Sequence, residues 1–301
     1  MSARLWTIAV PLLCLAACAE RPADPPTPPE PPPASPSNFD PKACGTIKGV
    51  VRWSGDLPSV EPFRSIDEPL TDQPDTPPAR NWPNPNAPSI HPTSRTLAGA
   101  IVFLRGVDPS KARPWYRPSL SIRLEGQTFR VHQQSQWTKP ESGDFWSCDV
   151  ESNVDFVRAG DKFGLVSYDD RLHVVQARGA AFFSLTLPAP GQVRERRLTP
   201  PGVVELTSGS GYFWMRAYVH VCAHPYYTRS DSNGVFLLDQ VPKGDYDLVA
   251  WHPDWRVSGE ERNPDLFRVQ QVRFGPPLES SRRVSVRAKQ KAEVDLALGV
   301  P

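Results

Sequence analysis

The sequence has almost no net charge. Its 34 basic and 33 acidic residues leave a formal charge of +1, so no overall field would attract nucleic acid or an anionic membrane surface. A nucleic-acid partner is therefore not expected. No extended stretch sustains the apolar stripe of an amphipathic helix either, which argues against a helical fold.

The short motifs that carry catalytic chemistry are also absent. The chain has no GxSxG elbow, no HExxH and no glycine-rich phosphate loop after a strand. The run Ser208-Gly209-Ser210-Gly211 is small and flexible, which favours a turn over a nucleophile. Asp231 and Asn233 lack the remaining acidic positions of a calcium loop. We therefore expect a protein that is not an enzyme.

The first 18 residues have the pattern of an export signal. Arg4 precedes an apolar run that ends at Ala17 and is too short to cross a bilayer as a permanent helix. Leu15-Ala16-Ala17-Cys18 resembles the bacterial lipobox, and this resemblance implies a signal peptide over 1–18 and acylation of Cys18, with palmitate among the attached chains. The alternative is an ordinary signal peptide with a coincidental cysteine.

The lipobox resemblance also predicts a location. Ala19 follows the cysteine where an Asp would retain a lipoprotein at the inner membrane, so the pattern resembles that of lipoproteins sent to the outer membrane. We expect a cell-envelope protein, anchored to a membrane by its N-terminal lipid and facing the periplasm or the exterior.

Cysteine is scarce, with five residues in the chain. Without the signal peptide and the lipidated Cys18, three thiols remain, which allows one disulfide at most. Cys222 lies in an apolar run, where a free cysteine acts as a small buried hydrophobe, so Cys44 and Cys148 are the disulfide candidates. Metal ligation by all three thiols is the alternative, but no CxxC pair supports it.

Proline is abundant, at 36 residues. Proline is disfavoured inside helices and central strands, so these residues mark linkers, edges and turns. Residues 19–43 are predicted to form a disordered, extended spacer; a ligand for a proline-recognising domain is the alternative. A second proline-rich stretch, 57–95, shows no strand or helix period and is predicted to be a surface insertion.

Short apolar runs separated by turn residues fill the rest of the chain. This spacing is typical of sandwiches and barrels, so the predicted class is all-β. Residues 45–53 form the first predicted strand, which we expect to pair with 97–104. The further predicted strands are 120–124, 128–132, 154–157, 163–168, 172–177, 181–187 and 193–198, then 213–222, 235–238, 246–251, 267–274, 283–286 and 292–298.

Two prolines and a glycine at Thr199-Pro200-Pro201-Gly202 mark a predicted boundary between two antiparallel β-sandwich domains, 44–200 and 201–301. Within the second domain, Asp231-Ser232-Asn233-Gly234 predicts a tight hairpin turn, because Asn and Gly tolerate positive φ. Residues 241–245 predict a second turn.

The second domain resembles a known family. Asp231 to Phe236 and Val241 to Tyr246 match the DxxGxF…VPxGxY pattern of the carboxypeptidase regulatory-like family. The resemblance implies a small transthyretin-like sandwich, related to carbohydrate-binding-like folds. The matched glycines and aromatics serve turns and core, so it implies no active site.

A second resemblance extends to bacterial exported proteins in which a cupredoxin-like domain precedes this module. Residues 167–176 and 209–215 correspond to their N-x-D…HNxH and C-x-x-H-P-W-M motifs. His173, Trp214 and Met215 match those motifs. The thiolate, the second histidine and the last histidine of HNxH are replaced by Gly209, Tyr212 and Gln176. A blue-copper centre needs a thiolate and two imidazoles, so the resemblance implies a degenerate metal site.

Other donors lie near the missing ligands in the sequence. His220 and Cys222 alternate on one predicted strand and share a face, and His224 follows them. The prediction is that His220 lies on a sheet surface and that no metal or other cofactor is bound. The alternative is a copper-binding or electron-transfer protein whose ligands are drawn from His173, Met215, His220, Cys222 and His224.

The predicted function is a non-enzymatic, lipid-anchored envelope protein that acts as a binding or assembly module. Its expected partners are the membrane, through the lipid, and an envelope protein or polysaccharide. A carbohydrate-binding module is a further alternative, because several of the nine tryptophans could stack on sugars. Trp82 and Trp115, among prolines, are expected to be exposed, and Trp214 and Trp251 are expected in the cores.

Overall fold

The computed structural model describes residues 38–65, 80–115, 117, 120–133, 152–265 and 268–300. The predicted signal peptide with Cys18, most of the proline-rich linker and Cys148 lie outside the described residues. So do residues 66–79 of the proline-rich insertion.

The fold is all-β, as the turn spacing predicts. The described residues otherwise contain only two short 3₁₀ helices, η1 (Pro41–Ala43) and η2 (Pro109–Lys111). Each begins with proline after an aspartate, Asp40 or Asp108, whose carboxylate accepts a backbone N–H of the first turn. Across this described part of the chain, no helix is long and apolar enough to cross a membrane.

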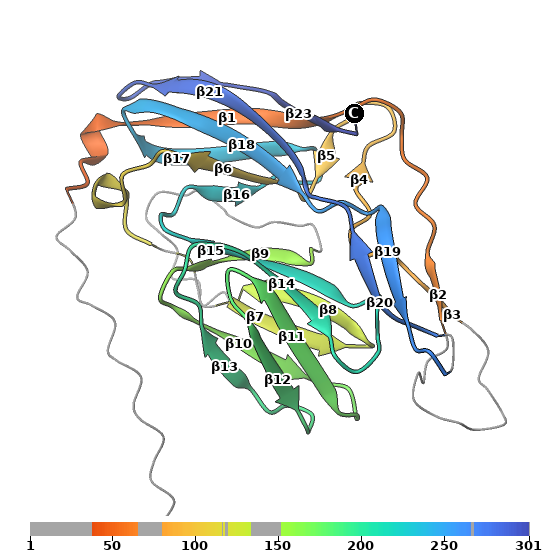
Figure 1. Cartoon of the computed structure of the whole chain (residues 1–301). Helices are drawn as coiled ribbons and strands as arrows, with labels where there is room; N and C mark the ends of the chain where they lie inside the picture. Colours follow the sequence, from red (N-terminus) through yellow and green to blue (C-terminus); the bar gives the residue numbers. More distant parts are fainter. Residues whose placement is uncertain are drawn as a thin grey trace, which may run out of the picture. The chain divides into compact units, whose positions relative to one another are not determined.

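One sandwich, called the frame sandwich here, is made from the two ends of the described chain (Figure 1). Its first sheet has the order β17 (Val235–Pro242), β1 (Cys44–Ser54) and β22 (Lys291–Glu293), and β23 (Leu296–Gly299) also pairs with β1. Its second sheet has the order β16 (Tyr227–Arg229), β6 (Ile101–Arg105), β18 (Gly244–His252) and β21 (Leu278–Val286).

The core of the frame sandwich follows from strand alternation. Strand β1 buries Ile47, Val51 and Trp53 on one face. Gly49, between them in the pattern, lies so close to the backbone of Val294 that a Cβ would be 1.9 Å from its carbonyl oxygen. Glycine at this position therefore allows the close approach between β1 and the segment that joins β22 to β23.

The second sandwich is called the inserted sandwich. One sheet has the order β13 (Arg194–Arg197), β10 (Lys162–Ser167), β7 (Leu120–Glu125) and β8 (Thr128–Gln133). The other has the order β12 (Phe183–Leu187), β11 (His173–Gly179), β14 (Gly202–Ser208), β15 (Arg216–Cys222) and β9 (Val154–Arg158). The core between them contains Ile122, Phe163, Leu165, Val175, Leu206 and Val219.

Most strand pairs are antiparallel, as predicted, but four are parallel. These are β1 with β22, β1 with β23, β10 with β7, and β15 with β9. Parallel neighbours need long connections between them, and each of these pairs is separated by many residues of chain. Spacing between turns identifies strands but gives no information about the direction of a distant partner.

Strand pairing does not follow the predicted boundary at residue 200. β1 and β6 precede that position and pair with strands that follow residue 226, whereas β14 and β15 follow it and pair with β11 and β9. The inserted sandwich thus lies within the chain of the frame sandwich, between β6 and β16. Thr199–Gly202 is only the connection between β13 and β14, because proline and glycine mark turns whether or not a domain ends there.

The predicted pairing of residues 97–104 with the first strand is also wrong. Only an isolated bridge joins Arg52 to Thr96, and β6 pairs with β16 and β18. The first two residues of the segment form β5 (Leu97–Ala98), which pairs with β4 (Ser89–Ile90).

The two sandwiches share a hydrophobic cluster, called the junction here. The frame sandwich contributes Ile101, Phe103, Val249 and Trp251, and the inserted sandwich contributes Val154, Phe156, Tyr218 and Cys222. The sheet that contains β6 and β18 is therefore buried on both faces, which explains why β6 is continuously apolar in sequence.

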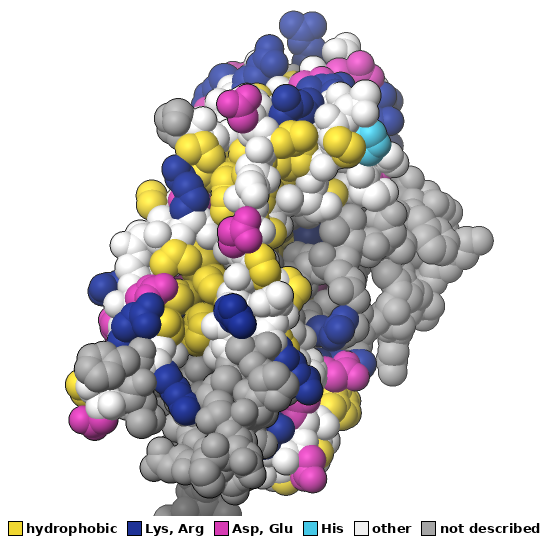
Figure 2. All heavy atoms as spheres, turned by 90° about the vertical axis from the view of Figure 1, so that its right-hand side faces the viewer, with side chains coloured by type: hydrophobic (Ala, Val, Ile, Leu, Met, Phe, Trp, Pro, Cys, Tyr) yellow, Lys and Arg dark blue, Asp and Glu magenta, His cyan; other side chains and the backbone are white. Residues whose placement is uncertain are grey.

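Two ribbons extend the contact between the sandwiches. The hairpin β19 (Val257–Arg262) and β20 (Val269–Phe274) places Val272 in the core of the inserted sandwich. The ribbon β2 (Phe63–Ser65) and β3 (Arg80–Trp82) belongs to the proline-rich insertion, and the Phe63 ring lies 5.5 Å from Phe213. This side of the molecule faces the viewer in Figure 2, where hydrophobic side chains form a broken band.

The insertion is more ordered at its ends than its sequence predicts. Trp82, expected to be exposed, is half-buried and stacks on Trp214 with ring centroids 4.5 Å apart and an interplanar angle of 10°. Asn86 is buried and donates hydrogen bonds to the Tyr218 hydroxyl and the Asp254 carbonyl, both at 2.9 Å. The sequence did not predict these contacts, because the insertion is polar and proline-rich and its partners are distant in sequence.

Replacement of Trp82 by alanine is expected to destabilise the protein by about 2 kcal/mol, because the stacked pair and part of its buried area are lost. Trp82→Phe keeps an aromatic ring and is the matched control, with less than half that loss expected. Urea unfolding measures both variants, and limited proteolysis should cut the insertion faster in Trp82→Ala. Equal stability of Trp82→Ala and the wild type would contradict the prediction.

Candidate functional site

His173, the histidine that matches the copper motif, lies at the start of β11 and is fully buried. Its Nε2 is 3.0 Å from Oδ2 of Asp169. Asp169 also accepts backbone N–H groups from Gly126 at 2.7 Å and Gln127 at 3.1 Å. Burial lowers the pKa of His173, and the charge of Asp169 opposes this effect. His173 therefore joins a hydrogen-bond network that ties its loop to the β7–β8 turn.

One position of the missing copper ligands, Tyr212, lies beside His173. The Tyr212 ring centroid is 5.4 Å from that of His173, and the Tyr212 hydroxyl accepts a hydrogen bond from Arg171 at 3.3 Å. A Cβ at Gly209 would lie 3.1 Å from Nε2 of Gln176, so these two positions are also adjacent. Val174 and Gln176 alternate with the buried His173 and Val175 along β11, so Gly209 and Gln176 lie on the face of β11 opposite His173.

Met215 and Trp214 belong to the core of the inserted sandwich. Both are buried, and the indole N–H of Trp214 donates to the carbonyl oxygen of Gln127 at 3.1 Å. This confirms the expectation that Trp214 is a core residue. Trp251 is likewise buried, in the junction.

The sequence predicted that His220 lies on a sheet surface, but the structure places it in the junction. The centroid of its ring is 4.7 Å from that of Trp251, in an edge arrangement. The rings of Phe103, Phe156 and Tyr227 also surround the imidazole of His220, at centroid distances of 6.1, 6.0 and 6.1 Å. Burial lowers the pKa of His220 to about 3. The predicted strand alternation is correct, but the face that carries His220 is covered by the frame sandwich.

Cys222 and His224 serve the same junction. The Cys222 thiol is fully buried and donates to the His220 carbonyl at 3.2 Å, and burial raises its pKa. Nδ1 of His224 accepts the backbone N–H of Tyr226 at 3.3 Å, and burial lowers the pKa of His224 to about 4.

The five weak metal candidates therefore fall into two places. His173 and Met215 lie within the inserted sandwich, and His220, Cys222 and His224 lie at the junction and the strand end beside it. Within the ranges that the structure describes, no group of three or more His, Cys, Asp or Glu residues is arranged to hold a metal ion.

Only one cysteine of the predicted disulfide lies among the described residues. Cys44 is buried at the start of β1, and its thiol donates to the carbonyl oxygen of Asp40 at 3.2 Å. Burial raises the pKa of this thiol. Because Cys148 lies outside the described residues, its pairing with Cys44 stays a prediction.

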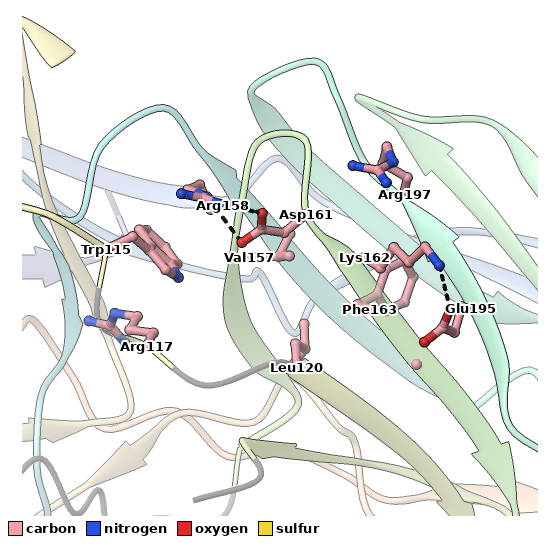
Figure 3. A pocket seen from close by; sticks show the side chains of 11 residues that line it. Trp115, Arg117, Leu120, Val157, Arg158, Asp161, Lys162, Phe163, Glu195 and Arg197 are labelled. Atoms are coloured by element: carbon pink, nitrogen blue, oxygen red, sulfur yellow. Dashed lines mark hydrogen bonds and ion pairs between the residues drawn. The ribbon is translucent and has the colours of Figure 1, made fainter. Parts of the chain in front are cut away.

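A polar hollow on the inserted sandwich, called the basic cleft here, has a volume of about 450 Å³. Figure 3 shows Trp115 and Arg117 on one side and Lys162, Glu195 and Arg197 on the other. Trp115 and Arg117 come from the segment between β6 and β7. The opposite wall comes from β10 and β13. The end of β9 supplies Arg158, and the turn that follows it supplies Asp161.

Ion pairs order part of this cleft. Asp161 accepts from Nε and Nη2 of Arg158 at 3.0 and 2.7 Å, and Nζ of Lys162 lies 2.9 Å from Glu195. The described residues that line the cleft include no histidine, cysteine or serine side chain that could act as a nucleophile or imidazole base. The cleft thus offers charge and an aromatic wall, a chemistry suited to binding.

Sequence reasoning did not find this cleft. Its residues come from three separate segments, and the Arg-Glu-Arg-Arg run of β13 was interpreted only as a strand. That run of cations on an edge strand is the one local signal that could have indicated it.

A second hollow of about 310 Å³ lies beside Trp53 and Trp255 on the frame sandwich. Both indoles are almost fully buried, and that of Trp53 donates to the Asp56 carbonyl at 2.8 Å. Little of either indole is exposed, so this hollow is a weaker candidate.

No family model matches the chain, and no curated protein matches it. Solved structures with partial likeness are cupredoxins. A purple cupredoxin from Nitrosopumilus maritimus has 17% identity and a TM-score of 0.21, over 23% of this chain and 78% of the other. The copper nitrite reductase NirK from Thermus scotoductus has 14% identity and a TM-score of 0.25, over 40% and 25%. The Cu(I) form of a methionine-to-alanine mutant of amicyanin has 12% identity and a TM-score of 0.25, over 40% and 98%.

Proposed function

We propose that this protein is a non-enzymatic binding or assembly module of the cell envelope, anchored by a lipid on Cys18 and operating without a copper centre. One observation carries the proposal. His173, the histidine that matches the copper motif, is hydrogen-bonded to Asp169, and Tyr212 packs beside it where the motif has a second imidazole.

The space at Gly209, the position of the missing thiolate, supports this interpretation. A Cβ at Gly209 would be 3.0 Å from a methyl group of Val174 and 3.1 Å from the Gln176 amide, tighter than ordinary contact. His173 itself is held by Asp169, and Tyr212 fills the place of the second imidazole. One imidazole and a thioether do not provide the ligand set of a blue-copper protein.

The absence of a catalytic set among the described residues of the basic cleft favours binding over catalysis. Both carboxylates there are engaged by cations, and this lining offers no nucleophile that either could activate. A module displayed by a lipid and a proline-rich spacer needs only an accessible surface for its partner.

A copper(II) titration of the soluble part, residues 38–301, tests the proposal. The expected result is neither an intense visible band of a thiolate site nor a rise in Tm, since a ligand that binds the folded state tightly raises Tm. Cys222→Ser is expected to lower stability by about 1 to 2 kcal/mol through burial of a more polar group, with no change in the titration. A tight stoichiometric copper complex that Cys222→Ser abolishes would establish the copper alternative.

A further inference from the structure

The basic cleft carries more positive charge than its own carboxylates neutralise. Its lining has four cationic side chains against two carboxylates, which leaves two cations in excess. The two ion pairs already described engage Arg158 and Lys162. Arg117 and Arg197 are the cations that remain.

Of these two arginines, Arg197 has less of its positive charge offset by carboxylates. Its Nη1 donates to the carbonyl oxygen of Gly160, a neutral acceptor, and its Nε is buried without a partner. Among the described residues, no carboxylate pairs with Arg197. Lys162 stands directly opposite Arg197 on β10, and like charges in this arrangement destabilise a sheet. An anion bound over these two side chains would offset this repulsion.

Arg117 is fixed on the other side of the cleft. Its Nη2 donates to the carbonyl oxygen of Tyr227, and its guanidinium lies 4.6 Å from the centre of the Phe156 ring. The charge of the buried Asp155 carboxyl partly offsets that of Arg117. Two ordered guanidinium groups thus bound the cleft, each with N–H donors beyond the one that its carbonyl engages.

The shape of the cleft fits a flat ring. Trp115 is half-buried against the junction and forms one wall (Figure 3). On the opposite wall Gly164 has no side chain, and a Cβ there would already be 3.3 Å from a methyl group of Val193. The volume of about 450 Å³ is within the range of small-ligand sites.

We propose that the basic cleft binds an anionic oligosaccharide, with the indole of Trp115 against a sugar ring and Arg197 on a carboxylate or sulfate group. This inference deepens the proposed function by naming its ligand class, and it rests on that function being binding. A sugar ring has an apolar face that suits an indole, and a guanidinium matches a carboxylate or sulfate with two parallel hydrogen bonds.

Isothermal titration of the soluble part with four probes tests the proposal. Tetragalacturonate supplies carboxylates, a carrageenan tetrasaccharide supplies sulfates, neutral galactotetraose lacks charge, and tetraglutamate supplies carboxylates without sugar. The expected result is binding of at least one anionic glycan, weakened by added salt, with neither galactotetraose nor tetraglutamate matching it. The carboxylate and sulfate arms separate the two sources of negative charge.

Two variants test the site. Arg197→Gln is expected to weaken glycan binding about tenfold or more, the effect of losing one charge-assisted contact. Arg178→Gln, which removes an exposed arginine of β11, is the matched control and should bind as the wild type does. Gly164→Val keeps every charge but fills the cleft, and it should abolish binding; circular dichroism at the titration temperature checks that the variant stays folded.

Three results would overturn the proposal: no binding of either anionic glycan to the wild type, equal binding by Arg197→Gln and the wild type, or a preference for tetraglutamate over both glycans. The last would indicate an acidic peptide partner. None of these outcomes bears on the copper titration, so failure of the ligand assignment is distinguishable from failure of the proposed function.

Discussion

Residues 201–301, expressed alone, are expected to remain unfolded. In this piece β17 and β18 lack β1 and β6, the strands that pair with them in the two sheets of the frame sandwich. The missing segments also supply buried core residues, including Ile47, Val51, Val102 and Leu104. Removal of one such side chain costs about 2 to 5 kcal/mol, and a whole domain is stable by only about 5 to 15 kcal/mol.

The matched experiment removes the inserted sandwich instead. The backbone N–H of Leu104 donates to the carbonyl oxygen of Tyr226 at 3.2 Å, so the chain leaves and rejoins the frame sandwich at adjacent residues of two paired strands. A chain in which an Asn-Gly turn joins Arg105 to Pro225 is expected to unfold cooperatively in urea. Polar replacements at Phe103 and Trp251 are needed in it, because the junction becomes exposed.

Far-ultraviolet circular dichroism and urea titration distinguish the two pieces. The predicted pattern is a sigmoidal transition for the joined frame sandwich and none for 201–301. A cooperative transition of 201–301 by itself would show that this part folds without β1 and β6.

Acidification is expected to destabilise the whole protein strongly between pH 6.5 and about 4. Burial lowers the pKa of His220 to about 3 and that of His224 and His252 to about 4, from an ordinary value of 6.5. In this window the unfolded chain binds a proton at each histidine and the folded chain does not. Stability is therefore present above pH 6.5 and is lost as the pH falls toward the folded-state pKa values.

The expected size of the acid effect is large. Each histidine contributes a slope of about 1.4 kcal/mol per pH unit, so three together approach about 4 kcal/mol per unit in the steep part of the curve. Asp155 acts in the opposite direction, because burial raises its pKa and its folded-state carboxyl binds a proton more readily than the unfolded one. The sum still favours acid unfolding, since three groups oppose one.

Urea unfolding at a series of pH values measures this effect. His220→Phe places a neutral ring among the aromatics of the junction and is expected to reduce the slope by one histidine's share, with stability at pH 8 nearly kept. Two results would show that these imidazoles are not buried in the neutral form. One is a slope that His220→Phe leaves unchanged, and the other is a free energy of unfolding that does not change between pH 7 and pH 4.5.

Local features of the fold were predictable because they depend on neighbouring residues. At the Asp231–Gly234 turn, the Asp231 carboxylate accepts the N–H groups of Asn233 and Val235, and Gly234 has a positive φ of 74°. The predicted hairpin is nevertheless wrong. The turn connects β16 in one sheet to β17 in the other, and β17 pairs with β1. Turn chemistry bends the chain but does not select the partner of the strand that follows.

The candidate sites also had one part that the sequence predicted and another that it did not. Of the motif positions, Tyr212 lies beside His173, whereas Gly209 faces Val174 and Gln176 on the other side of β11. The role of Asp169 could not be inferred from the sequence, because its other partners are backbone amides of a distant turn. The basic cleft depends on the connection between the two sandwiches, which strand patterns do not reveal.

The parallel pairing of β1 with β23 determines how mechanical tension would pass through the protein. β1 begins directly after the proline-rich linker, and Val51 to Ser54 pair with Leu296 to Gly299 near the C-terminal end of the described chain. A pull between the two ends would load this strand pair in shear along its ladder of hydrogen bonds. The strands of the inserted sandwich lie in the chain between β6 and β16 and do not belong to this strand pair, so they would not carry this load.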